Sequence, residues 1–204
     1  MEHSKLPFTS HFSKLRDQPK WVLKLILVVI LSIATAIVST LAIDYIELYK
    51  DMGLSGAQLE QTKTFAKISG LVGGSISSII GIGVTFLIFW IIARIINSDA
   101  SKKSIFSATL SYTIIIKIIG LVILLIQWAT GLSVTDYNIA SLNVFNKGNN
   151  VLKAFNLQNL IGAYVFGVML YATFRLSKKS SIIWSIIYLI VVIGFGVIGA
   201  VINN

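Results

Sequence analysis

Cysteine is absent from this chain of 204 residues, and charged residues are scarce, at 12% of the sequence. The absence of cysteine excludes disulfides, thiolate metal sites and cysteine nucleophiles. A soluble domain usually has about 25% charged residues. The low charge and the 55% content of hydrophobic residues therefore predict a protein whose solvent is lipid.

Acidic residues and histidines are also missing from the long apolar runs. Catalytic sites need converging acids, bases, nucleophiles or metal ligands, and proton pumps need an ionisable chain at membrane depth. We therefore expect no enzyme activity, no metal site and no cofactor. Asp44, Glu47 and Asp51 cluster just after the first apolar run. We interpret this cluster as a solvated helix end, and cation binding is the alternative.

Five apolar runs are long enough to cross a bilayer, which takes about 20 helical residues. They lie at about 21–43, 68–92, 105–128, 157–176 and 182–202. The sequence thus predicts an all-α fold, a polytopic transmembrane helix bundle with five spans over residues 21–204. Residues 1–20 form an arm before it.

The basic residues predict the orientation of this bundle. With the N-terminus inside, 11 Lys and Arg residues fall on the cytoplasmic side and 5 on the outer side. Positive residues are enriched in cytoplasmic loops, so we expect the N-terminus in the cytoplasm and the C-terminus outside. The net charge of +9 then indicates contact with anionic lipid headgroups, and no motif indicates nucleic-acid binding.

The arm carries the pattern of a helix that lies in the membrane interface. Phe8, Phe12 and Leu15 are spaced i, i+4 and i+7, so they share one helical face. Lys14 and Arg16 flank that face, where lipid phosphates would lie. We therefore predict a short amphipathic interfacial helix with its apolar side in lipid.

Two outer segments carry weaker signals. Residues 55–67 fit a second interfacial helix or, equally well, a solvated linker helix. Residues 129–153 are rich in Ser, Asn and Gly and exceed an ordinary connection in length. We expect this long loop to be either mobile or a contact surface.

Lys117 lies near the middle of the third predicted span, five residues after Tyr112. A lysine at this depth costs about 2.5 to 3.5 kcal/mol on insertion scales, so it should face protein or water. One reading is structural, with the ammonium donating to carbonyls or to a hydroxyl of Tyr112, Tyr164 or Tyr171. The other is that Lys117 binds an anionic lipid or ligand.

Small residues recur at four-residue spacing in the second and fifth predicted spans. Such spacing lets two helix backbones approach closely in lipid. The residues concerned are Gly70, Gly74, Ser77, Gly81, Gly196 and Ala200. They predict helix packing, either within the chain or against a second copy or another membrane protein.

Three blocks of the sequence, taken in order, resemble the bacterial YIP-domain family, which is named for Ypt/Rab-interacting proteins. The first runs from Pro7-Phe8 through the arm to Pro19-Lys-Trp-Val-Leu. The second block is 93–112, and the third is 155–162 with Leu176-Ser-Lys-Lys-Ser after it. The Asp-Leu-Tyr-Gly-Pro signature of eukaryotic members is missing, so the resemblance does not extend to GTPase binding.

This resemblance implies a non-catalytic accessory protein of the bacterial cytoplasmic membrane. Some relatives of this kind work beside an ABC-type exporter in resistance to antimicrobial peptides, so exporter subunits are the implied partners. The rival hypothesis is a small carrier or lipid-handling protein that uses Lys117.

Overall fold

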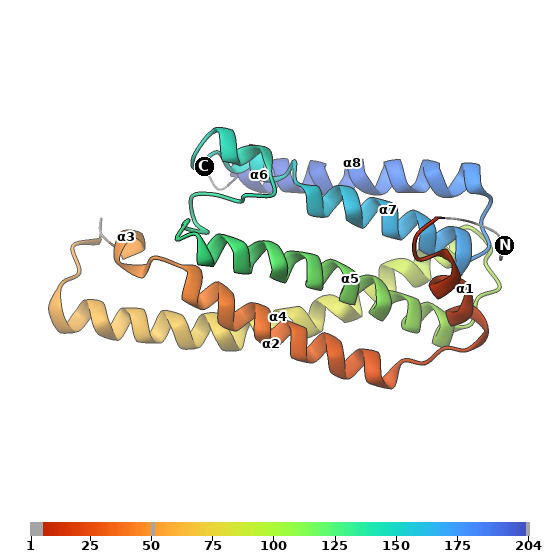
Figure 1. Cartoon of the computed structure of the whole chain (residues 1–204), viewed down its shortest axis with the longest axis horizontal. Coiled ribbons are helices and arrows are strands. Elements are labelled where there is room, and N and C mark those ends of the chain that lie inside the picture. The colour runs from red at the N-terminus through yellow and green to blue at the C-terminus, as the bar shows by residue number, and fades with distance from the viewer. Residues whose placement is uncertain (1–5, 50–51, 203–204) are drawn as a thin grey trace.

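The computed structural model describes residues 6–49 and 52–202, and every regular element in this part of the chain is a helix. The long helices lie side by side along one axis (Figure 1). The elements are α1 (Thr9–Asp17), α2 (Val22–Ala42), α3 (Tyr45–Tyr49), α4 (Gly56–Ile95), α5 (Lys102–Ala129), η2 (Leu142–Phe145), α6 (Asn150–Lys153), α7 (Leu157–Ala172) and α8 (Lys178–Ile202). The predicted all-α class is confirmed.

The two ends of the bundle differ in what they carry (Figure 1). We call the end with α1 and the α4–α5 and α7–α8 turns the arm end. The end with α3, η2 and α6 is the loop end.

Four of the helices, α2, α4, α5 and α8, are long and apolar enough to cross a membrane. They contain most of the predicted runs 21–43, 68–92, 105–128 and 182–202. The predicted run 157–176 is represented by α7, which has only 16 residues. A helix of that length measures about 24 Å, against about 30 Å for the hydrocarbon core.

The long loop before α7 is folded and lies at the loop end. Its centre is the fully buried Asn143, whose side-chain amide donates to the carbonyls of Asn146 and Asn149, each at 3.2 Å. The Asn143 side-chain oxygen Oδ1 accepts from the Asn138 N–H at 2.8 Å. This segment packs α6 against the end of α8, beyond the end of the short α7 (Figure 1).

The helix α4 is continuous over 40 residues, which corresponds to a length of about 60 Å. The prediction of a separate interfacial helix over 55–67 is therefore wrong. No proline interrupts this stretch, since the chain has only Pro7 and Pro19. The segment simply prolongs the membrane helix, and this N-terminal part of α4 extends past the rest of the bundle at the loop end (Figure 1).

Two buried clusters hold the bundle together. The larger includes Phe12 of α1, Phe89 of α4 and Phe166 of α7. The smaller joins α2, α4 and α5 through residues such as Val28 and Leu110. The outward faces of the long helices are apolar and exposed, as lipid contact requires.

Candidate functional site

Lys117 belongs to a chain of polar contacts that crosses three helices. Its ammonium on α5 donates to Ser78 Oγ on α4. Ser78 donates to Ser32 Oγ on α2 at 2.9 Å, and Ser32 donates to the Val28 carbonyl at 2.7 Å. The serines give the lysine a protein acceptor where the surrounding side chains are apolar.

Two of the three tyrosines proposed as acceptors for Lys117, Tyr112 and Tyr164, have other partners. The Tyr112 and Tyr188 hydroxyls lie 2.5 Å apart, and Tyr164 donates to the Pro7 carbonyl at 3.2 Å. The predicted bond from Lys117 to Tyr112 or Tyr164 is therefore wrong. Five residues along a helix correspond to a rotation of about 140°, so Lys117 and Tyr112 lie on different faces of α5.

Tyr112 instead lies in an aromatic cluster between α4, α5, α7 and α8. Its ring is 5.2 Å from that of Phe89, and the rings of Phe166 and Tyr188 are 4.9 Å apart. A Cβ on Gly162 would come within 3.2 Å of the Tyr112 hydroxyl. The glycine therefore allows α7 to approach this cluster closely, and Tyr112 has a packing role.

One face of α1 packs onto the protein. Phe12 and Leu15 are buried, and Thr173 at the end of α7 donates through Oγ1 to the Phe12 carbonyl at 2.9 Å. Phe8, just before the helix, and Lys14 remain exposed. The prediction that this apolar stripe faces lipid is wrong for Phe12 and Leu15, because the same spacing serves a protein core equally well.

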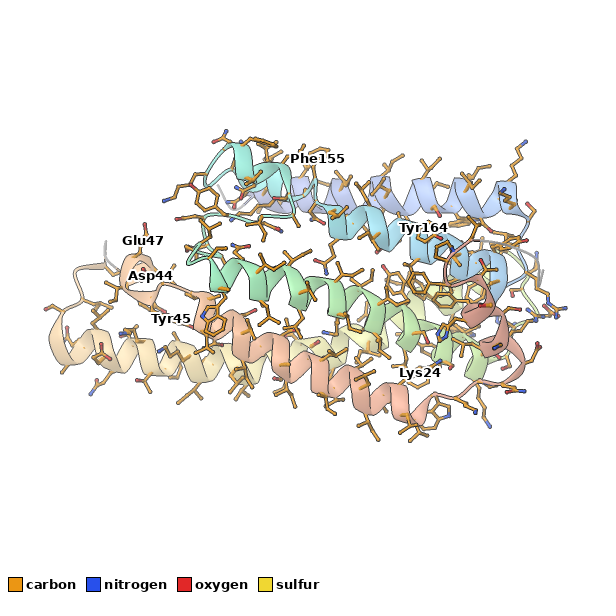
Figure 2. All side chains as sticks on the ribbon, in the orientation of Figure 1. Lys24, Asp44, Tyr45, Glu47, Phe155 and Tyr164 are labelled. Atoms are coloured by element: carbon orange, nitrogen blue, oxygen red, sulfur yellow. The ribbon has the colours of Figure 1, made fainter. Side chains whose placement is uncertain are left out.

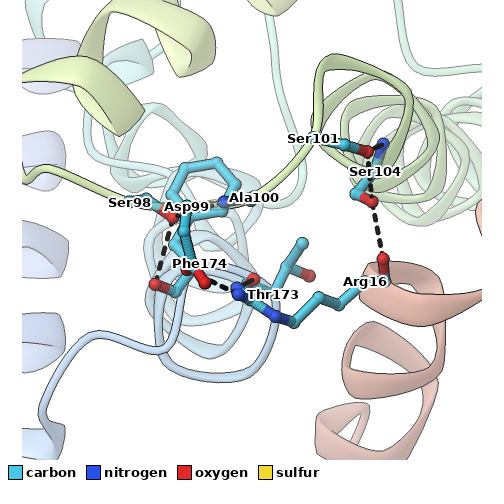
Figure 3. Close-up of polar contacts among 8 residues, drawn as sticks. All are labelled: Arg16, Ser98, Asp99, Ala100, Ser101, Ser104, Thr173 and Phe174. Carbon is cyan, nitrogen blue, oxygen red and sulfur yellow. Dashed lines mark hydrogen bonds and ion pairs between the residues drawn. The ribbon is translucent and has the colours of Figure 1, made fainter.

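Arg16 ties α1 to two turns at the arm end (Figure 3). It forms an ion pair with Asp99 in the α4–α5 turn, at 2.5 Å, and donates to the Thr173 carbonyl at 2.8 Å. Ser104 at the start of α5 donates to the Arg16 carbonyl at 2.7 Å. The hydrogen bond from Arg16 lowers the pKa of the Asp99 carboxyl, which is otherwise solvated. Arg16 therefore contacts protein groups where we had predicted lipid phosphate.

His11 sits at the same junction, with Nε2 at 3.1 Å from Ser111 Oγ. Burial lowers the pKa of His11, and the charges of Lys24 and Lys14 lower it further. Lys24 of α2 donates to Ser107 Oγ on α5 at 3.0 Å. Serine hydroxyls on α5 thus form hydrogen bonds with polar side chains from both α1 and α2.

The small residues predicted to pack divide into two groups. Gly70 and Gly74 face α2, and a Cβ on Gly74 would lie 3.7 Å from Ala36 Cβ. Gly196 lies against Ala154, at the end of α6, where an added Cβ would come within 2.8 Å of Ala154 Cβ. Ala200, one turn further along α8, is buried.

Ser77 and Gly81 form the second group, which packs against no other described helix. Ser77 is exposed, and a Cβ on Gly81 would meet no described atom within 4 Å. Gly73, four residues before Ser77, is equally open. We call Gly73, Ser77 and Gly81 the open stripe of α4.

The largest cavity described here, about 640 Å³, lies at the loop end between α2, α3, α4 and the turn after α5. Asp44 and Glu47 line it and lie near Tyr45 (Figure 2). Asp44 accepts from the N–H groups of Ile46 and Glu47, at 2.9 and 3.1 Å, and so caps α3. Asp51 lies outside the described residues. Among those described, no three His, Cys, Asp or Glu side chains gather as metal ligands would.

Comparison with known proteins gives matches over nearly the whole chain. The family model described as the Yip1 domain matches residues 7–201. The membrane protein YknW of Bacillus subtilis (strain 168) is 26% identical over 200 residues, an alignment that covers 95% of this chain and 86% of that protein. No solved structure gives a significant match.

Proposed function

Because the chain belongs to the Yip1 domain family of membrane proteins, we propose that it is a non-catalytic accessory protein that packs against another membrane protein. The proposed location is the bacterial cytoplasmic membrane. The arm end would face the cytoplasm, and α7 together with the folded loop before it would complete a fifth crossing.

The observation that carries this proposal is the open stripe of α4. Helices associate in lipid through close packing at small residues, since apolar side chains gain nothing by leaving lipid for one another. Gly70 and Gly74 already serve the contact with α2, whereas Gly73, Ser77 and Gly81 present small residues to the surroundings. This stripe suits the close approach of a helix from a second protein.

The family resemblance suggests the class of partner. Subunits of an ABC-type exporter are the candidates, and the accessory role would be to assist their assembly or activity. A second copy of this chain is the competing occupant of the same stripe. The mass of a crosslinked product distinguishes these two occupants.

Site-specific photo-crosslinking in intact cells tests the proposal. A photoreactive side chain at Ser77 should give a discrete adduct with a different membrane protein. The matched control is Ile79, which is also exposed but is rotated about 200° around α4. A product with the mass of two identical chains, or equal labelling from both positions, would contradict the proposal.

The carrier hypothesis has less structural support. The ammonium of Lys117 is engaged by Ser78, and Lys117 does not line the 640 Å³ cavity. A carrier that meets its solute at Lys117 would first have to break this contact.

A further inference from the structure

A narrow apolar groove of about 320 Å³ runs between α7 and α8 at the arm end. Its α8 wall is one helical face, at i, i+3, i+4, i+7, i+8 and i+11. That face consists of Lys178, Ser181, Ile182, Ser185, Ile186 and Leu189. The opposite wall comes from α7 and includes Val168 and Tyr171.

The groove has the length of one membrane leaflet. Lys178 and Leu189 are eleven positions apart along α8, which corresponds to a rise of about 16 Å. Half of the hydrocarbon core measures about 15 Å. A chain lying in the groove with its polar end at Lys178 would therefore reach roughly to the middle of the bilayer.

The arm helps to close this groove. Leu6 lines it, and Tyr164 of α7 donates to the carbonyl of the next residue, Pro7 (Figure 2 labels Tyr164). At Gly167 of α7 the two helices are in close contact, because a Cβ there would collide with Ser185 Oγ. The groove is therefore a built feature of three segments and not a gap between two loosely packed helices.

The one charged side chain that lines the groove and its one buried, unpartnered hydroxyl lie one turn apart at the same end, and they suit a lipid headgroup. Lys178 is exposed, and its ammonium makes no hydrogen bond or ion pair with any residue that the structure describes. Ser181, one turn deeper, is 4% exposed, and its hydroxyl has no partner among the described residues. A cation at the membrane surface attracts anionic lipid, and the ester carbonyls of a phospholipid lie just beneath its phosphate.

We propose that this groove binds one acyl chain of an anionic glycerophospholipid, with the phosphate at Lys178 and an ester carbonyl within reach of the Ser181 hydroxyl. The occupant is a structural lipid that seals α8 to α7 and the arm. The open stripe on α4 plays no part in this site, so the two proposals stand or fall separately.

Photolabelling of the intact purified protein tests the site. The probe is phosphatidylglycerol with a diazirine midway along one acyl chain, in phosphatidylcholine nanodiscs. The label should fall on the peptides that contain Val168 and Ile186. Unlabelled phosphatidylglycerol should compete, and additional phosphatidylcholine should not.

Two matched pairs of variants separate the groove from general surface charge. Lys178→Gln should reduce labelling about fivefold, since a basic residue near the surface is worth about 1 kcal/mol. Lys179→Gln, next to it but outside the groove, should leave labelling unchanged. Ile182→Trp should fill the groove and abolish labelling, whereas Ile183→Trp, equally apolar and outside it, should not. Ile186→Trp replaces Ile182→Trp if that variant does not fold.

Other results would overturn the proposal. Equal labelling of Lys178→Gln and Lys179→Gln would show that Lys178 does not contact the headgroup. Equal competition by phosphatidylcholine would show that the groove does not prefer anionic lipid. Unchanged labelling in a folded Ile182→Trp variant would place the acyl chain elsewhere.

Discussion

Ser78 of α4 accepts a hydrogen bond from Lys117 of α5 inside the helix bundle. Through Ser32 this contact extends to the Val28 carbonyl of α2, so one basic side chain links three helices. We call this set of contacts the cross-link. The serines are needed mainly because the lysine is there.

This relationship predicts an asymmetry between two substitutions. Ser78→Ala should destabilise the protein by about 1.5–3 kcal/mol, because it leaves a charged donor without its partner. Lys117→Leu should be nearly neutral, because an apolar side chain replaces the charge and the serines can bond to each other. Thermal unfolding in detergent measures both, and the double variant should match Lys117→Leu.

The control for this pair is Ser75→Ala. Ser75 donates only to the Leu71 carbonyl of its own helix, at 2.8 Å, so its loss should have little effect. If Lys117→Leu lowered the unfolding temperature as much as Ser78→Ala, the lysine and the serine would contribute equally to stability. That result would contradict the predicted asymmetry.

The Arg16 junction predicts which contacts hold α1. Arg16→Ala removes the bonds to both Asp99 and the Thr173 carbonyl. Protection of the α1 amides against hydrogen exchange should then fall roughly tenfold. Asp99→Asn should have a smaller effect, because exposed ion pairs contribute little. An equal loss in both variants would mean that the ion pair alone anchors the arm.

His11 predicts that the arm loosens in acid. Burial and the charges of Lys24 and Lys14 lower the pKa of His11 when α1 is packed, so the detached arm binds the proton more readily. Packing is therefore strongest above the unperturbed histidine pKa of about 6.5 and weakens as the pH falls through it. Exchange of α1 amides at pH 7.5 and 5.5, corrected for intrinsic rates, measures this. His11→Gln should remove the difference, and a persistent difference would point to another group.

The absence of cysteine makes the proposed orientation simple to test. A membrane-impermeant maleimide should label Asn146→Cys in intact cells but not Lys103→Cys or Lys179→Cys. The last two should react only in inside-out vesicles. Labelling of Lys103→Cys from outside would reverse the orientation. Labelling of Asn146→Cys and Lys179→Cys from one side would mean that α7 and the preceding loop do not cross.

The helices α2, α4, α5 and α8 were predictable because apolar length is a local property of the sequence. The length of the helix in the fourth predicted run, 157–176, was less predictable. The helix α7 ends at Ala172, and Arg175 then adopts a left-handed conformation in the turn to α8. The buried Asn143 that organises the loop gave no periodic signal. Hydropathy reports how apolar a segment is. It does not show that a folded loop will pack beyond the end of a short helix.

The candidate site was predictable in its residues but not in its contacts. Lys117 stood out by its depth, yet Ser78 is one of many small residues in α4, and only the packing of α4 on α5 selects it. The apolar face of α1 was equally visible, but a stripe such as Phe12 and Leu15 does not reveal whether lipid or protein covers it.

The measurement that tests the accessory function most directly is the yield of the photo-crosslinked partner adduct from Ser77 in two glycine variants of α4. A Cβ at Gly81 or at Gly83 meets no described atom within 4 Å, and the two positions are rotated about 200° from each other. Gly81→Leu should abolish the adduct and Gly83→Leu should preserve it, with both variants equally stable. Equal yields from the two variants would contradict the account.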